Sequence, residues 1–225
     1  MIEFILMLTH DDETVPSARE AYEEVRGTGL RYIGFKDIGA TSDQLREITV
    51  AAHADNLEVM LEVVSLSLED ELNSISIGRD IGVDWILGGT HPEHALEVIG
   101  GTRIRYCPFA GSVTGHPSIL HGSVTEIAEH ASKLSSLSGV SGIDLLAYRH
   151  PGNDVGELTR AVANATAGTL IAAGSVHSIE QVEVLAKAGA WGFTIGSAIF
   201  EGQLPGGPGL RGQVAQVLRY AGSTS

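Results

Sequence analysis

The sequence has almost none of the cysteine that cross-links small extracellular domains, since Cys107 is the single one among 225 residues. One cysteine excludes an internal disulfide and is typical of a protein in a reducing compartment. Long apolar runs are absent too, because none approaches the ~20 residues that a bilayer-spanning helix needs. The apolar segment 1–8 is interrupted by Glu3 and has no basic stretch before it. We therefore expect no export signal and no membrane anchor, and predict a cytoplasmic protein.

Positive charge is scarce. The chain has 14 lysines and arginines against 28 acidic residues, which gives a formal net charge of −14. The field of such a protein repels polyanions. The charge balance therefore argues against nucleic acid and against an anionic membrane as partners.

Glycine and short apolar runs are abundant. The chain has 28 glycines, and eight apolar runs are each followed by an amphipathic helical pattern: 2–8, 31–36, 57–63, 83–87, 103–107, 142–147, 169–173 and 191–195. Alternation of strand and helix favours a parallel sheet, and eight repeats predict a single (β/α)8 TIM barrel over residues 1–225. The length suits this fold as one domain. A doubly wound open sheet is the alternative.

The starts and ends of several helices are marked by capping residues. Ser67, Ser123 and Ser178 each precede an acidic residue or glutamine by three positions, which predicts capping boxes. Helix ends are expected near four glycines: Gly78, Gly100, Gly139 and Gly189.

Alternation along each strand predicts which side chains point into the barrel. Outward residues pack on helices and are apolar, so the polar residues between them face inward. Lys36, Glu62 and Tyr148 fall at the C-terminal ends of their strands, where barrel enzymes build active sites. The other inward charges fall toward the opposite ends: Glu3, Glu58, Asp84, Arg103, Arg105 and Asp144. Because buried acids are seldom left unpaired, we expect Asp144 to form a structural ion-paired layer with Arg103 and Arg105.

Two glycine turns near the end of the chain predict a phosphate site. The seventh strand runs into Gly174, Ser175 and Val176, and the eighth into Gly196 and Ser197. Glycine lets an oxyanion approach the backbone, and N–H groups at a helix start donate hydrogen bonds to it. The loops after strands 7 and 8 are where barrels hold phosphate. The structural alternative is that these glycines only form tight turns.

The segments 171–176 and 194–199, IAAGSV and TIGSAI, resemble the phosphate-binding (β/α)8-barrel superfamily. They are similar to the histidine-biosynthesis ribonucleotide isomerase, N-acylmannosamine-6-phosphate epimerase and the hexulose and keto-gulonate phosphate decarboxylases. The resemblance covers residues 169–202 and implies a small phosphorylated ligand. The catalytic motifs of these families do not match: the Asp-x-Lys-x-x-Asp signature is absent, and Glu62 and Val63 stand where the epimerase has a lysine. The reaction is therefore left open.

Lys36 and Glu62 are the first candidates for chemistry. On adjacent strands they form an acid/base pair for proton transfer beside a sugar carbonyl. A desolvated Lys36 is also suited to act as a Schiff-base nucleophile. A structural ion pair at the barrel mouth is the alternative.

Further candidates lie in loops. Tyr148, Arg149 and His150 follow the sixth strand, with Arg149 suited to grip a carboxylate or phosphate and His150 to move a proton. His91 follows a glycine pair, and His116 lies in the small-residue loop 108–117, which has the composition of either a mobile lid or an ordered cover. The nine histidines include no His-Glu-x-x-His array, so we expect neither a catalytic metal nor a cofactor.

These patterns predict a cofactor-independent isomerase or epimerase of a small phosphorylated sugar or related metabolite. Two alternatives stay open: an aldolase, lyase or decarboxylase that uses Lys36, and a non-catalytic barrel that binds a phosphorylated ligand. A homo-oligomer is compatible with the exposed helices of a barrel, although no face is indicated.

Overall fold

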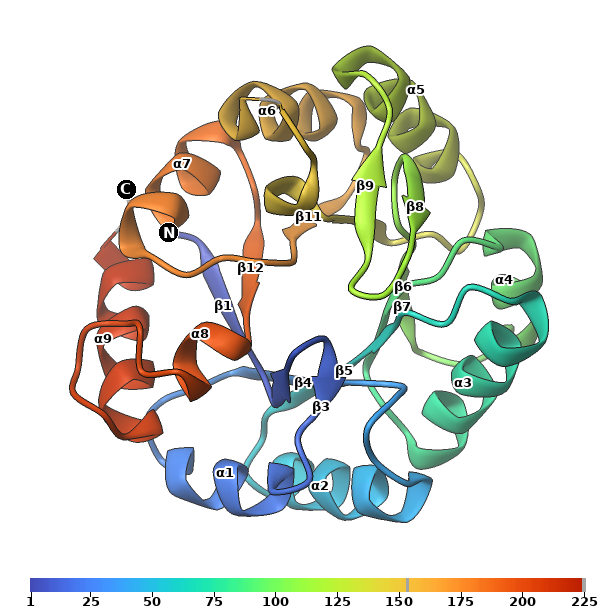
Figure 1. Ribbon diagram of the computed structural model, residues 1–225. Helices are drawn as coiled ribbons and strands as arrows, with labels where there is room; N and C mark the ends of the chain where they lie inside the picture. Colours follow the sequence, from blue (N-terminus) through green and yellow to red (C-terminus); the bar gives the residue numbers. More distant parts are fainter. Residues whose placement is uncertain (153, 224–225) are drawn as a thin grey trace.

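The computed structural model describes residues 1–152 and 154–223. In this part of the chain eight parallel strands surround a central axis, and Figure 1 views them along it. The strands are β1 (Glu3–Met7), β4 (Tyr32–Lys36), β5 (Glu58–Val63), β6 (Trp85–Gly88), β7 (Arg105–Cys107), β10 (Gly142–Leu145), β11 (Thr169–Ala172) and β12 (Gly192–Ile195). Seven lie within the predicted apolar runs, and β6 extends one residue beyond the run 83–87, so the eight predicted strands are confirmed.

The barrel closes between β7 and β10. The sheet order is β10-β11-β12-β1-β4-β5-β6-β7, which leaves these two strands at the edges. Bridges at Tyr106–Val140 and Phe109–Asp144 join them, and the Asp144 amide donates to the Pro108 carbonyl at 3.0 Å. The sheet therefore forms a (β/α)8 barrel, and the open doubly wound alternative is wrong.

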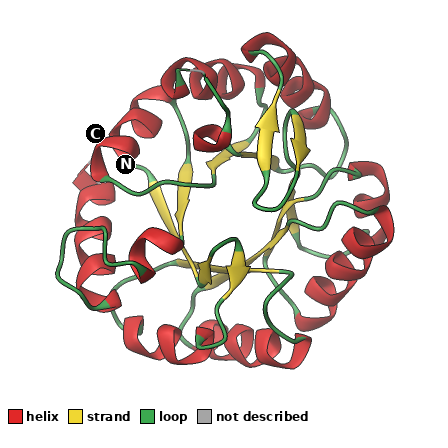
Figure 2. Cartoon of the chain, viewed as in Figure 1, coloured by secondary structure: helices red, strands yellow, loops and turns green. Residues whose placement is uncertain are grey.

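A ring of helices covers the barrel on all sides (Figures 1 and 2). The helices are α1 (Ala18–Val25), α2 (Ser42–Ala54), α3 (Leu68–Ile81), α4 (Pro92–Ile99), α5 (Val124–Ser135), α6 (Val155–Ala165), α7 (Ile179–Ala188), α8 (Ser197–Phe200) and α9 (Leu210–Ser223), with a 3₁₀ turn η1 (Ala147–Arg149). None of the helices in residues 1–152 and 154–223 combines the length and apolarity needed to cross a bilayer.

The predicted helix starts are confirmed. The hydroxyls of Ser67, Ser123 and Ser178 each accept a hydrogen bond from the backbone N–H three residues later. At Ser123 the box is reciprocal, because Glu126 accepts from the Ser123 amide at 2.8 Å. Gln181 instead accepts from the amide of His177 at 2.7 Å.

The predicted helix ends are partly wrong. Gly100 and Gly189 do cap helices α4 and α7. Gly78 lies inside α3, and the residue that caps this helix is Gly82. A glycine is needed at position 78 because the helix packs closely there: a Cβ would lie 2.7 Å from Leu61. Gly139, with a φ of +102°, shapes the turn after α5 rather than its cap.

The barrel divides the core into two. Inside it, a cluster of apolar side chains fills the axis: Ile5, Met7, Tyr32, Met60, Trp85, Leu87, Cys107 and Ile171. The outward residues of the strands pack on the helices in a second, larger cluster. The alternation read from β4 and β5 is therefore confirmed, and it places Lys36 and Glu62 inside the barrel.

The expected partners of Asp144 lie elsewhere. Arg105 binds Glu58 at 2.5 Å and stacks over Trp85 at 3.8 Å, at the N-terminal end of the barrel. Arg103 is exposed. The predicted ion-paired layer of Asp144, Arg103 and Arg105 is therefore wrong, since a cation-π contact and Glu58 hold Arg105 away from the axis.

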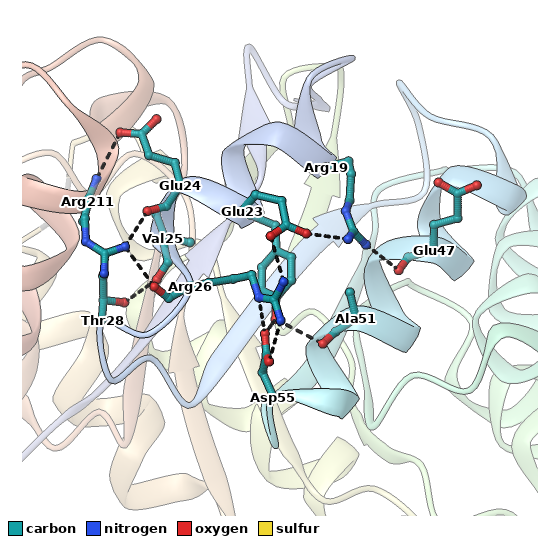
Figure 3. Close-up of polar contacts among 11 residues, drawn as sticks. Arg19, Glu23, Glu24, Val25, Arg26, Thr28, Glu47, Ala51, Asp55 and Arg211 are labelled. Carbon is teal, nitrogen blue, oxygen red and sulfur yellow. Dashed lines mark hydrogen bonds and ion pairs between the residues drawn. The ribbon is translucent and has the colours of Figure 1, made fainter.

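Side-chain contacts on the outside join the two ends of the chain (Figure 3). The Arg26 guanidinium lies between Glu23 and Asp55, with Nε 2.6 Å from the Asp55 carboxylate. Arg211, just inside α9, donates to the carbonyls of Glu24 and Arg26, both at 2.9 Å. The last helix is thereby fastened to the first, which completes the helix ring.

Loss of the α5 cap has a measurable cost. Ser123→Ala is expected to lower the free energy of unfolding by about 1 kcal/mol, because the Glu126 amide at the start of α5 loses the hydroxyl that accepts its hydrogen bond. Ser17→Ala is the matched control, since Ser17 stands before α1 without a side-chain capping bond. It should change stability by less than about 0.5 kcal/mol. Equal losses in urea unfolding would contradict this account.

Candidate active site

A pocket of about 220 Å³ lies at the C-terminal end of the barrel and gathers the main predicted site residues. Its lining includes both glycine turns and a set of charged side chains: Gly174, Ser175, Val176, Gly196 and Ser197, with Asp12, Lys36, Glu62 and Arg149. Segments far apart in the sequence therefore meet at one opening. The predicted phosphate turns and the predicted acid/base pair share a single cavity.

Asp12 reaches this pocket from a hairpin that the sequence analysis did not anticipate. Strands β2 (Thr9–His10) and β3 (Glu13–Thr14) pair antiparallel, leaving Asp11 and Asp12 as a two-residue turn. Both have positive φ values, +50° and +69°, a conformation that aspartate tolerates better than most residues. Thr14 fastens the hairpin to Lys36 by accepting from its amide at 2.8 Å. The turn thereby holds the Asp12 carboxylate above Lys36.

Asp12 is the central anion of the site. One of its oxygens accepts from Lys36 Nζ and, at 2.7 Å, from Arg149. Its other oxygen accepts from the Ser118 amide at 3.2 Å. Lys36 Nζ also lies 3.5 Å from Glu62, and Lys36, Glu62 and Asp12 are each no more than 4% exposed. The mouth therefore holds an alternating set of two cations and two acids, of which Lys36, Glu62 and Asp12 are buried and Arg149 is 16% exposed.

The charged groups of this cluster shift one another's pKa values. Burial by itself raises the pKa of Asp12, but the hydrogen bond from Arg149 and the charge of Lys36 outweigh it, so that this pKa falls well below its usual range. Burial acts on Arg149 in the opposite sense, and Asp12 more than compensates, which raises the pKa of the guanidinium. Both groups are therefore ionised together at neutral pH.

Sequence reasoning missed Asp12 although a signal was present. Residues 9–14 follow the first predicted strand, and no site residue is predicted among them. Thr9-His10 and Glu13-Thr14 around Asp11-Asp12 have the spacing of a tight hairpin with a two-residue turn. Such short strands carry too little apolar pattern to be recognised alone.

Both glycine turns are fitted to neighbouring side chains. Gly174 has a φ of +77°, and a Cβ there would lie 2.7 Å from Arg149 Nε. A Cβ at Gly196 would lie 2.3 Å from the Thr9 hydroxyl. Because glycine has no side chain, Gly174 leaves room for the Arg149 guanidinium. Gly196 leaves room for the hairpin that carries Thr9.

Two residues of the predicted 148–150 group point away from the pocket. Tyr148 donates to the Gln181 carbonyl at 3.1 Å, and burial raises its pKa to about 12. His150 Nε2 lies 2.7 Å from the Gly122 carbonyl. Both line an adjoining cavity of about 550 Å³ that shares Asp12, Arg149, Ser175 and Ser197 with the first. Arg149 alone of the three lines both.

His91 lies outside the pocket, contrary to its predicted place among the catalytic residues. Its Nδ1 is 2.8 Å from the buried Glu71 carboxylate, which also accepts from the His91 and Thr90 amides. Glu71 belongs to α3 and is fully buried. His91 therefore anchors the loop after β6 to that helix.

The loop 108–117 contributes to an ordered hairpin. Strands β8 (Ser112–Thr114) and β9 (Ile119–His121) pair at the barrel opening (Figure 1). His116, between them, lies 3.7 Å from both Asp12 and Glu13. The two hairpins therefore meet over the charged cluster.

One group of potential metal ligands occurs in the described residues, at the rim of the pocket. The donor atoms of His10, Asp11 and Glu201 lie within 4.8 Å of one another. His10 Nε2 is 3.1 Å from Glu201, and His10 Nδ1 is 3.3 Å from Asp11. The contacts of His10 with Asp11 and Glu201 explain why these three side chains lie together.

The lowered pKa of Asp12 predicts an acid-dependent loss of stability. Its contribution is complete above the ordinary aspartate pKa of about 3.9 and is lost as the pH falls toward the lower folded value. Asp12→Asn should lose about 3 kcal/mol at pH 7 and decline less steeply below pH 4. Asp11→Asn, in the same turn but exposed, should follow the wild type. Parallel pH–melting curves for all three proteins would refute this role.

No family model matches this sequence, and no curated protein sequence is similar enough to indicate a relative. Solved structures are similar in fold. One described as native KDPGal has a TM-score of 0.68 at 15% identity and covers 98% of this chain and 95% of its own. Orotidine 5'-phosphate decarboxylase from Pyrococcus horikoshii OT3 gives 0.65 at 14%, covering 96% and 97%. Monomers generated from the dimeric phosphoribosylanthranilate isomerase of Thermotoga maritima give 0.66 at 14%, covering 99% of both chains. The chain shares the (β/α)8 fold with these structures.

Proposed function

We propose that this protein is an isomerase or epimerase of a small phosphorylated sugar or related metabolite, which moves a proton without a cofactor. The observation that carries the proposal is the sharing of one pocket by two glycine turns, Arg149, Lys36 and Glu62. A phosphate group and a neighbouring carbonyl then fit within a single cavity. The fold likeness to enzymes named for phosphorylated compounds supports the same ligand class.

The phosphate is assigned to the glycine turns. Amides of Ser175, Val176 and Ser197 supply donors there, and Arg149 adds a charge-assisted contact from the side. The donors are largely fixed in the backbone, so a protein of net charge −14 binds one small dianion without a lysine cluster. This explains how an acidic surface and an anionic ligand coexist.

Proton transfer is assigned to Glu62 and Lys36. Glu62 takes a proton from the carbon beside the substrate carbonyl and, in an isomerisation, returns it to the neighbouring carbon. In an epimerisation the planar intermediate turns its opposite face to Glu62 before the proton returns to the same carbon. The Lys36 ammonium stabilises the negative charge that develops on the carbonyl oxygen meanwhile. Asp12 holds Lys36 in position for this.

A lyase or aldolase is the second candidate, because Lys36 is 4% exposed and lines the cavity. In that reaction the Lys36 amine attacks the carbonyl carbon and loses water to give a Schiff base. The close contacts of Lys36 with two carboxylates favour the electrostatic role instead.

Gly174→Ala is expected to abolish the rise in melting temperature produced by inorganic phosphate, because its Cβ displaces Arg149. Gly202→Ala is the control. Gly202 also has a positive φ, +70°, but a Cβ there meets nothing within 4 Å. Both variants carry similar backbone strain, so the difference reports on Arg149. If the two variants respond equally to phosphate, the assigned phosphate site is wrong.

Glu62→Gln and Lys36→Met should each slow proton exchange on the substrate by about 100-fold or more. Aldose and ketose phosphates are incubated in deuterated water, and loss of the C–H signal is followed by proton NMR. Glu58→Gln is the control, since Glu58 lies on the same strand but binds Arg105 at the far end. Trapping of Lys36 by borohydride together with carbon–carbon cleavage would favour the lyase, and unimpaired exchange in both site variants would disprove the proton-transfer assignment.

A further inference from the structure

Asp144 is a buried acid that the proposed proton transfer does not use. It points into the barrel from β10 and is 0% exposed. Neither of its carboxylate oxygens has a hydrogen-bond partner in residues 1–152 and 154–223. A fully buried carboxylate without hydrogen bonds is strongly disfavoured relative to its neutral acid.

The groups around Asp144 reinforce its neutral form. Burial raises its pKa well above the ordinary value, and the charge of Glu62 on β5 raises it further. Lys36 on β4 and Arg149 on η1 act in the opposite direction without reversing the shift. The remaining titratable neighbour is Cys107 on β7, whose own pKa is raised by burial and by Asp144.

The net charge of the cluster at the pocket mouth depends on whether Asp144 is protonated. Lys36 and Arg149 carry two positive charges, and Asp12 and Glu62 carry two negative charges. An ionised Asp144 makes the cluster net negative. A phosphate group that enters beside Arg149 would then meet added repulsion.

We propose that Asp144 acts as a neutral carboxylic acid, a positioning residue that keeps the charged cluster balanced so that an anion binds beside Arg149. This inference rests on the proposed function, because it assumes that the pocket takes a phosphorylated ligand. No covalent step is involved. Asp144 acts through its neighbours and does not line the pocket itself.

Infrared spectroscopy tests the protonation state without any ligand. The wild type is expected to show a carboxylic-acid carbonyl band at pH 7 that shifts in deuterated water. Asp144→Asn should lack this band, and Asp80→Asn, an exposed matched substitution, should keep it. A wild type without the band at pH 7 would overturn the proposal, and this holds even if Asp144→Asn fails to fold.

Anion binding tests the functional consequence. Sulfate is the probe, because its charge does not change between pH 6 and 10. Wild-type affinity should fall by about tenfold once Asp144 ionises on the alkaline side, a change equivalent to about 1.4 kcal/mol. Asp144→Asn should lose this fall, whereas Asp80→Asn should retain it. An identical alkaline fall in wild type and Asp144→Asn would refute the role of Asp144.

The two proposals fail in different ways. If neither sulfate nor phosphate binds the wild type at any pH, the proposed function is wrong, although the infrared band can still appear. If both anions bind with Arg149-dependent affinity but Asp144→Asn behaves as the wild type at every pH, only the role of Asp144 is wrong.

Discussion

The candidate site depends on the Asp12 carboxylate, which forms ion pairs with two cations. Lys36 comes from the second barrel strand and Arg149 from the turn after the sixth, and Asp12 joins them across the opening. Without that anion, two buried positive charges would face each other with Glu62 as the remaining nearby carboxylate. The hairpin that carries Asp12 is therefore as much a part of the site as the strands are.

The two glycine turns are shaped by the same charged cluster. Gly174 is small because the Arg149 side chain passes against it, and Gly196 because Thr9 of the hairpin lies there. Each turn makes room for a residue that completes the cluster and leaves its amides at the cavity. The shape of the glycine turns and the placement of the charged groups are thus consequences of one close packing.

The interior of the barrel explains why a third acid, Asp144, can exist below the cluster. Its axis is filled by apolar side chains, so Asp144 finds no donor and its neutral form is favoured. Burial strengthens the interactions among the charged groups at the mouth. It also makes an additional buried charge energetically unfavourable. In the proposed role, a neutral Asp144 leaves the two cations and two acids at the mouth balanced.

Much of the fold was readable from the sequence. Eight apolar runs alternating with helical patterns predicted the eight strands, and the two-residue period placed Lys36 and Glu62 inside the barrel because side chains alternate across a strand. Both are local properties. The glycine turns were found in the same way, and the structure places both at one cavity with the lysine and the glutamate.

The tertiary structure decided which polar groups meet. Asp12 joins Lys36 through a hairpin too short to leave an apolar pattern, Arg105 turns to Glu58 and Trp85, and Asp144 is left without the expected arginines. Strand period tells which face a side chain takes, but not its height along the axis or which neighbour it reaches. Those depend on register and on packing across the barrel, and contacts between residues distant in sequence determine both.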